Sequence, residues 1–352
     1  MKISRLDFLL AFLSVVLIFW TCAREFYLPD DMNYISEIFS MRDNTTSVAR
    51  NSSVFYLLVE FFAQLFFLNQ FESYRVLLVV NLFLFLSVLY RLLYIAKFSG
   101  WLNGSIFSAI ISTLYLSPYL LIQIRSSISA SLAVHCFISL LFAPPSSILN
   151  LFFPFVLLLS SGLLHLSSLP FVLTTLFFII FRYFFNVPSL NFKKFMSFLW
   201  NIHKYSFYFT PLFFSLGYLF SVSLLSDNFS IAYQLSTFSD VDQQVFSWPS
   251  FLILLLCACL VEPLFVNTKV FVSSTINFIL PSLLIFSISF IGGSSYYFPL
   301  QQRFLVPYSL LLIPLVISRI FDKPRSPTTV FLIYIITILT VVTSSRRLLL
   351  LL

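Results

Sequence analysis

Charged side chains are scarce in this chain. They supply 9% of its 352 residues, whereas 59% are hydrophobic and 47 are phenylalanine. Apolar segments of about 20 residues recur along the whole length, and each is long enough to cross a hydrocarbon core of about 30 Å. These segments leave no room for a separate soluble domain. The composition therefore predicts an integral membrane protein.

The alternation of apolar and polar residues that marks a membrane β-strand is also missing. Barrel strands are segments of about 10 residues with alternating hydrophobicity, whereas the apolar runs here are hydrophobic on every face. A helix satisfies its backbone polar groups internally, as the hydrocarbon requires. We therefore expect an all-α polytopic bundle in which residues 1–352 form one integral membrane domain.

Cysteine, histidine and glycine are rare as well. The four cysteines lie inside or at the edge of apolar segments, where they are typical of small buried hydrophobic residues. The three histidines are far apart in the sequence, so a dedicated metal centre is not expected. The sequence contains no Gly-rich phosphate loop, no metal-spaced His/Cys cluster and no nucleophile elbow. No motif of a soluble enzyme is present, and we expect no metal and no other cofactor.

Basic residues outnumber acidic ones, but they are scattered. The net charge is +7, and Lys and Arg lie at the ends of apolar segments, as the cytoplasmic loops of a membrane protein require. We therefore expect the lipid bilayer as a partner and no nucleic acid. Lys2 and Arg5 place the N-terminus in the cytoplasm. The first apolar segment lacks a small-x-small cleavage site, so it is expected to remain as the first span.

Hydropathy and charge together predict about eleven crossings. The acidic loops 23–52 and 226–248 are expected outside, and the lysine- and arginine-rich loops inside. The candidate spans are 6–22, 74–92, 104–123, 126–142, 148–163, 166–182, 205–225, 249–267, 270–292, 303–320 and 328–343.

Segment 53–69 leaves two topologies open. If it crosses the membrane, Arg75 and Arg125 face the cytoplasm, and 148–182 crosses once as a long broken helix. If it lies along the outer surface, both arginines face outside. Residues 148–182 then form two crossings with His165 at the outer turn.

Two local features favour the second topology. Glu60 and Gln64 are one helical turn apart and share a polar face, which suits an interfacial helix better than a lipid-exposed span. Gly162 and Pro170 favour a turn over a continuous helix. We therefore expect 23–73 to form an external loop that contains an interfacial helix.

A set of ionisable residues faces outward in this topology. It consists of Asp30, Asp31, Arg125, His165 and Arg303. A charged group near membrane depth is costly unless it pairs or lines a wet cavity, so each is a candidate site residue. The alternatives are arginines that snorkel from helix ends, a hydrogen-bonded buried histidine and ordinary solvated loop acids.

Small and aromatic residues surround the two arginines. Serines and alanines follow Arg125, which favours close helix contact or a polar cavity. Near Arg303, the side chains of Gln302, Tyr296 and Tyr297 would form a polar, aromatic surface suited to a sugar. Tyrosines also belong to the ordinary interface belt of membrane proteins, so this alternative stays open.

Four short elements occur in a distinctive order. They are a D-x-x-x-Y stretch (DDMNY, 30–34), an I-R-x-x-x-(A/S) element (IRSSIS, 124–129), a histidine element (SSGLLHLSSL, 160–169) and a Q-R-F element (302–304). This order resembles the EpsG-like branch of bacterial polysaccharide repeat-unit polymerases, the O-antigen and capsule polymerases. The resemblance covers about residues 1–320, and the family's usual I-R-Q-G-L-A is IRSSIS here.

The resemblance implies a multi-span glycosyltransferase of the GT-C type in the bacterial cytoplasmic membrane, with its active site facing outward. Such an enzyme moves a growing glycan from undecaprenyl diphosphate onto a fresh lipid-linked repeat unit. A chain-length regulator is a conceivable protein partner. The residues expected to act are Arg125 and Arg303 on the diphosphate, Asp31, Asp30 or His165 as the base, and Tyr34, Tyr296, Tyr297 and Gln302 on the sugar.

Two other functions fit a basic polytopic chain. The first is a flippase for the same lipid-linked oligosaccharide, although transporters usually show repeated halves with Gly- or Pro-broken helices, and only 6 glycines occur here. The second is a related GT-C ligase or a polyprenyl-phosphate-sugar glycosyltransferase. Loss of a ligase would abolish all attached chains, whereas loss of a polymerase would shorten them.

Overall fold

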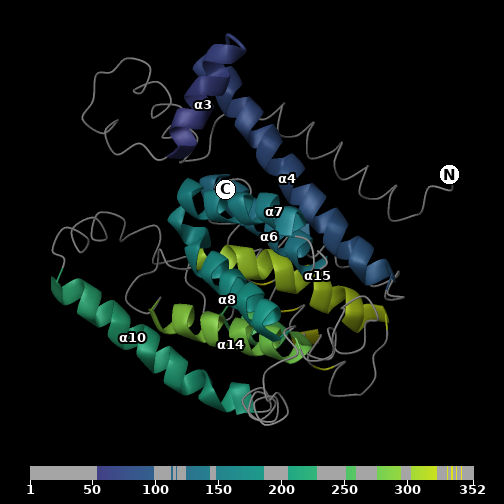
Figure 1. The fold of residues 1–352 in the computed structure, drawn as a ribbon, viewed down its shortest axis with the longest axis vertical. Coiled ribbons are helices and arrows are strands. Elements are labelled where there is room, and N and C mark those ends of the chain that lie inside the picture. Colours follow the sequence, from purple (N-terminus) through teal and green to yellow (C-terminus); the bar gives the residue numbers. More distant parts are fainter. Residues whose placement is uncertain are drawn as a thin grey trace.

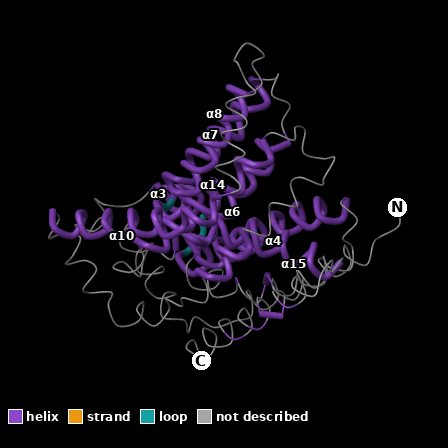
Figure 2. The backbone as a smooth tube through the Cα atoms, turned by 90° about the horizontal axis from the view of Figure 1, so that it is seen from below, coloured by secondary structure: helices purple, strands orange, loops and turns teal. Residues whose placement is uncertain are grey.

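The computed structural model describes a helical protein. It covers residues 54–98, 112–113, 116, 124–142, 148–185, 205–227, 251–258, 276–294 and 303–322, together with single positions between 331 and 342. No strand occurs in these residues, so the expected all-α class is confirmed for them (Figures 1 and 2). The bounded helices are α3 (Val54–Leu65), α4 (Gln70–Phe98), α6 (Ile124–Phe142), α7 (Ile148–Leu164), α8 (Leu169–Phe185), α10 (Thr210–Asp227), α14 (Ile276–Ser294) and α15 (Val306–Asp322), with short 3-10 turns η2 (Leu166–Ser168) and η3 (Ser206–Phe209).

Among the described helices, α4 is long and apolar enough to cross a membrane. Its apolar stretch Phe71–Tyr94 has 24 residues, which rise about 36 Å. The other described apolar helices are shorter. They coincide with the expected spans at 126–142, 148–163, 166–182, 205–225, 270–292 and 303–320. The expected spans 6–22, 104–123, 249–267, 270–292 and 328–343 lie wholly or partly outside the described residues, so the number of crossings stays a prediction.

Helix α3 ends and α4 begins at a sharply defined corner. Phe67 has a left-handed φ of 54°, and the N–H of Leu68 donates to the carbonyl of Ala63 at 2.9 Å, which closes α3 as in a Schellman motif. The side chain of Asn69 then accepts from the N–H of Glu72 at 2.9 Å. The Glu72 carboxylate accepts from the Asn69 N–H at 2.8 Å, completing a capping box that starts α4.

Helix α3 is too short to cross a membrane. Its 12 residues rise about 18 Å, whereas the hydrocarbon core is about 30 Å thick. Glu60 and Gln64 share its exposed face and are joined by a hydrogen bond of 3.2 Å. Val59 is buried with Tyr74 and Ile124, which lie near the beginnings of α4 and α6. The position of segment 53–69 relative to a membrane stays a prediction.

The chain breaks at His165, between α7 and α8. The backbone there is extended, with φ −156° and ψ 126°, and His165 caps the single turn η2. A Cβ added to Gly162 would be in ordinary contact with side chains at the beginning of α8. Residues 148–182 thus form two helices and not one continuous helix, as Gly162 and Pro170 predict.

Helices α4 and α6 run in the same direction. Near their beginnings, Tyr74 of α4 is buried with Ile124 of α6. Farther along, Arg91 of α4 is hydrogen bonded to His135 of α6. Because α7 returns along α6 to the turn at His165, that turn lies at the end of the bundle where α4 and α6 begin.

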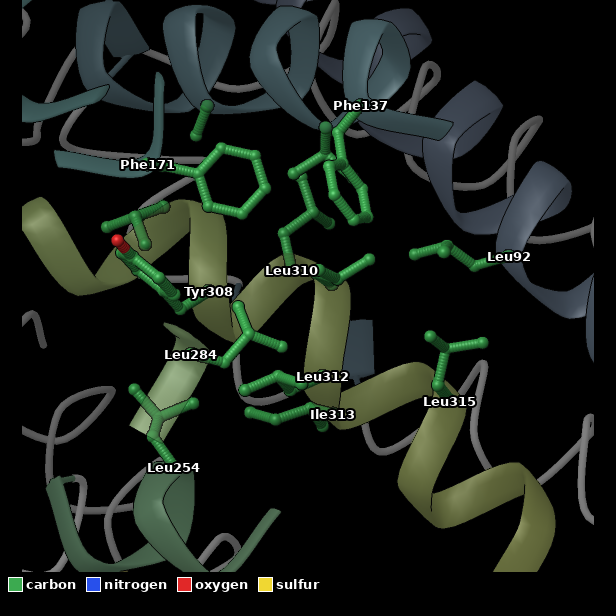
Figure 3. Close-up of a cluster of buried hydrophobic side chains, with 14 of the residues drawn as sticks. Leu92, Phe137, Phe171, Leu254, Leu284, Tyr308, Leu310, Leu312, Ile313 and Leu315 are labelled. Atoms are coloured by element: carbon green, nitrogen blue, oxygen red, sulfur yellow. The ribbon is translucent and has the colours of Figure 1, made fainter. Parts of the chain in front are cut away.

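Helix α15 passes through the centre of the hydrophobic core (Figure 3). Tyr308, near its beginning, packs edge-on against Phe171 of α8, with 5.1 Å between ring centroids. Leu315, two turns farther on, lies on the same side of the core as Leu92 of α4 (Figure 3). Helix α15 therefore also begins near the turn between α7 and α8 and runs toward the second half of α4.

Glycines allow α10 and α14 to lie backbone against backbone, side by side in Figure 1. A Cβ added to Gly217 would fall on the carbonyl oxygen of Phe290. A Cβ added to Gly293 would fall on the carbonyl oxygen of Phe214. Small residues at such crossings are typical of helix packing in membranes.

Candidate functional site

Serine hydroxyls form hydrogen bonds between the beginning of α6 and the turn between α7 and α8. The Ser129 hydroxyl lies 2.6 Å from the carbonyl oxygen of Ser161 and 2.6 Å from the hydroxyl of Ser168. All three side chains are fully buried. Of the two interpretations of the small residues after Arg125, close helix contact is the one that the structure shows at Ser129.

His165 is held in this turn through Nδ1. The backbone N–H of Ser167 donates to Nδ1 at 3.1 Å, the Ser167 hydroxyl lies 2.7 Å from it, and the Ser126 hydroxyl lies 3.4 Å from it. A backbone N–H can only donate, so Nδ1 accepts and carries no proton. The neutral ring therefore has its proton on Nε2. Among the described residues, no hydrogen bond reaches Nε2.

Two arginines that are far apart in the sequence lie near this imidazole. Arg125 is the second residue of α6, and Arg303 lies in a short 3-10 turn directly before α15. His165 is in the turn between helices, and burial is the main cause that lowers its pKa to about 4. The positive charges of Arg125 and then Arg303 lower this pKa further. Ser126, the neighbour of Arg125, lies 3.4 Å from Nδ1 of His165, and α15, which begins three residues after Arg303, packs against η2.

This arrangement can hold an anion. Guanidinium groups bind phosphate oxygens in pairs and stay protonated. A neutral imidazole supplies one further N–H donor. Like charges that gather where water is partly excluded are costly unless a counter-charge or water compensates them. Arg125, His165 and Arg303 therefore form the candidate functional site, at the end of the bundle where α4, α6 and α15 begin.

The remaining candidate residues cannot be placed relative to this site. Asp30, Asp31, Tyr34, Tyr296, Tyr297 and Gln302 lie outside the described residues. Their roles as base and as sugar contacts stay predictions. Within the described part of the chain, no three His, Cys, Asp or Glu side chains gather in a way that could hold a metal ion.

A second polar cluster, centred on Arg91 and His135, was not predicted from the sequence. Arg91 Nη1 donates to Nδ1 of His135 at 3.0 Å and to its carbonyl oxygen at 3.2 Å. Both Nη atoms lie 3.1 Å from the Ser139 hydroxyl. Nε2 of His135 lies 2.5 Å from the Ser87 hydroxyl. The sequence signal for this cluster is a pair of polar residues one turn apart on each helix, Ser87 with Arg91 and His135 with Ser139.

A local sequence pattern also indicates Ser167, the residue that holds the His165 ring in place. Ser167 follows His165 by two residues, and Ser, like Asp and Asn, often bonds the backbone or side chain two positions away in a tight turn.

Comparison with protein-family models, with curated proteins and with solved structures finds no match to this chain.

Proposed function

We propose that this chain is a polytopic membrane glycosyltransferase of the GT-C type that polymerises lipid-linked oligosaccharide repeat units. Its substrate would be an oligosaccharide on undecaprenyl diphosphate, and its product an O-antigen or capsular polysaccharide. The reaction would take place at the outer face of the bacterial cytoplasmic membrane. The proposal rests on the order of the four sequence elements and on the composition of the site.

The proposed reaction breaks one bond and forms another at the anomeric carbon of the donor glycan. The bond to the diphosphate oxygen breaks, and its electron pair stays on that oxygen. The hydroxyl oxygen of the acceptor sugar bonds to the anomeric carbon, and its proton passes to a carboxylate. Negative charge develops on the departing diphosphate, so cations fixed in advance around it lower the barrier.

The observation that carries the proposal is the approach of Arg125 and Arg303 to one imidazole. Both guanidiniums lie near enough to His165 to depress its pKa. Two arginines from separate segments of the chain suit the two phosphates of a lipid diphosphate, because each planar fork can bind two oxygens.

The arrangement of helices also supports the outward-facing topology. If segment 53–69 crossed the membrane, charge counting would place Arg125 and Arg303 on opposite sides. The position of both arginines beside the turn that holds His165 agrees with the topology in which segment 53–69 lies along the surface and both arginines lie on one side. The 12-residue length of α3 supports the same topology.

Replacing either arginine tests the proposal. In a strain from which the gene is deleted, Arg125→Ala or Arg303→Ala should leave glycan of a single repeat and no long chains. Loss of one preorganised donor typically lowers the rate by about 10² to 10³. The measurement is glycan length on a gel, with the amount of each variant in the membrane measured in parallel. Arg75→Ala, an exposed arginine near the beginning of α4, is the matched control and should retain long chains.

The outcomes separate the competing functions. Long chains made by Arg125→Ala at normal protein level would contradict the assignment of the site. Loss of every attached chain, single repeats included, would indicate a ligase. Accumulation of lipid-linked repeats that stay inaccessible from outside the cell would indicate a flippase.

A further inference from the structure

One nitrogen of the His165 imidazole, Nδ1, already accepts a hydrogen bond within the protein. Nδ1 accepts the backbone N–H of Ser167 at 3.1 Å, within a turn whose own backbone is fixed. The His165 N–H donates to the Ser161 carbonyl at 3.3 Å, and the Ser168 N–H donates to the His165 carbonyl at 3.1 Å. The Ser167 side chain is buried, so water cannot easily replace the imidazole as the acceptor of this N–H. The turn therefore fixes both the orientation of the ring and its tautomer.

The other nitrogen, Nε2, carries the proton of the neutral ring. Arg125 and Arg303, which are both positive, are charged groups that lower the pKa of this ring. An added proton on this ring is disfavoured by both charges and by burial. An anion held between the two guanidiniums, in contrast, would find a third donor in the Nε2–H. The surroundings oppose a charged imidazole and suit a neutral one.

We infer that His165 is a neutral hydrogen-bond donor to the bound diphosphate through Nε2, and not the base that takes the acceptor's proton. This inference rests on the proposed function for the identity of the anion, but its geometry concerns any phosphate-bearing ligand. A base would need a lone pair on Nε2, and hence a proton on Nδ1. That proton would face the Ser167 N–H and remove its acceptor.

The inference assigns the proton of the reaction to another group. The acceptor hydroxyl loses its proton as its oxygen bonds to the anomeric carbon, and a carboxylate must receive it. Asp31 and Asp30 are the remaining candidates that the sequence supplies. His165 forms no covalent bond and transfers no proton in this scheme.

The tautomer can be measured directly on the full-length protein in detergent micelles. The ¹⁵N NMR signals of labelled histidine distinguish a protonated Nε2 from a protonated Nδ1, and the signal of His165 is identified by its absence in His165→Gln. We expect protonation on Nε2 in the wild type and in Ser167→Ala, which keeps the backbone N–H. A proton on Nδ1 of the wild-type ring would overturn the inference, whatever the protein does in cells.

Binding of inorganic pyrophosphate, measured by calorimetry on the same preparations, tests the donor role. The amide of glutamine can place an N–H near the position of Nε2, whereas that of asparagine reaches only as far as Nδ1. His165→Gln should therefore bind pyrophosphate within about threefold of the wild type. His165→Asn and His165→Ala should bind about tenfold more weakly or worse, the loss of one hydrogen bond to a charged group. Equal binding by wild type and His165→Ala would overturn the donor role.

Glycan length in cells separates this inference from the proposed function. If the inference holds, His165→Gln keeps long chains that His165→Ala loses, whereas a base role predicts that both variants lose them. Chain length in the deletion strain could also stay the same whether the strain carries the wild type, a variant or neither. If pyrophosphate binding still follows the pattern above, polymerisation is the wrong function and the donor role of His165 stands. If chain length follows Arg125 and Arg303 but His165→Gln behaves as His165→Ala, the donor role is wrong and the polymerase remains.

Discussion

The two histidines of the described bundle both have arginines nearby, but they differ in what binds Nδ1. At one end, the Arg91 guanidinium of α4 is hydrogen bonded directly to Nδ1 of His135 on α6, at 3.0 Å. At the other end, Nδ1 of His165 is bound by the backbone of its own turn. The nearby cations, Arg125 and Arg303, act on this second ring through their charge.

Arginines can therefore serve two purposes in one helical bundle: they can join helices, or they can form an anion site. The Nη atoms of Arg91 are committed to acceptors on one helix, His135 and Ser139, so this cluster ties α4 to α6. At the His165 end, positive charge comes from the beginning of α6 and from the turn before α15. The first arrangement satisfies the hydrogen bonds of one guanidinium within the bundle, whereas the second places two cations where an anion could bind.

The largest expected effect that separates the two clusters is on stability. Arg91→Leu removes the donor to His135 and Ser139 and leaves Nδ1 of His135 without this donor in an apolar region, at a cost of about 2–3 kcal/mol in the free energy of unfolding. Arg125→Leu should cost less, because it also relieves the repulsion between two gathered cations. The measurement is unfolding of the full-length protein in detergent micelles.

The reverse order of these two losses of stability would contradict the distinction between the two clusters. If Arg125→Leu destabilises the protein more than Arg91→Leu does, the cations at the His165 end serve the fold, and the anion site loses its support. Arg75→Leu is the control for the removal of an exposed arginine, and it should change the free energy of unfolding by about 0.5 kcal/mol or less.

A smaller effect is expected from the hydroxyl that binds Arg91. Ser139→Ala removes an acceptor shared by both Nη atoms, and we expect a loss of about 1 kcal/mol in the free energy of unfolding. Ser160→Ala is the matched control, because the one hydrogen bond of its hydroxyl within the described part of the chain goes to the Val156 carbonyl of its own helix. Pyrophosphate binding should be unchanged in both variants. Weaker binding in Ser139→Ala would mean that the two clusters are coupled.

The sequence predicts the helical class well, because one physical demand governs it. A chain with so few charges and such long apolar runs must satisfy its backbone internally, and only helices fit that pattern here. The break at His165 is predicted equally well by local chemistry, since glycine and proline act on the backbone wherever they stand. Glu60 and Gln64 meet on one face of α3 because a helical turn brings them together.

The sequence could not predict the contacts between distant helices. Nothing in the spacing of Arg125 and Arg303 says that they approach one imidazole, since their meeting depends on how α6, α15 and η2 pack. The partnership of Arg91 and His135 depends likewise on two helices that run in the same direction. The role of Ser167 lies between these cases, because its bond to His165 is local but becomes important only when the arginines are near.

The smallest expected effect is an absence of pH dependence. Burial and the two arginines lower the pKa of His165 to about 4, below its ordinary value near 6.5, so the ring stays neutral from about pH 8 down to about pH 5. The ratio of polymerisation rates in wild type and His165→Gln should therefore stay constant, within about twofold, across this range. The measurement is polymer formation by the purified enzyme with lipid-linked repeat units, at each pH for both proteins. A general base of ordinary pKa would instead lower the wild-type rate alone as the pH falls through about 6.5. A ratio that falls in this way would show that the imidazole titrates and would place His165 among the bases.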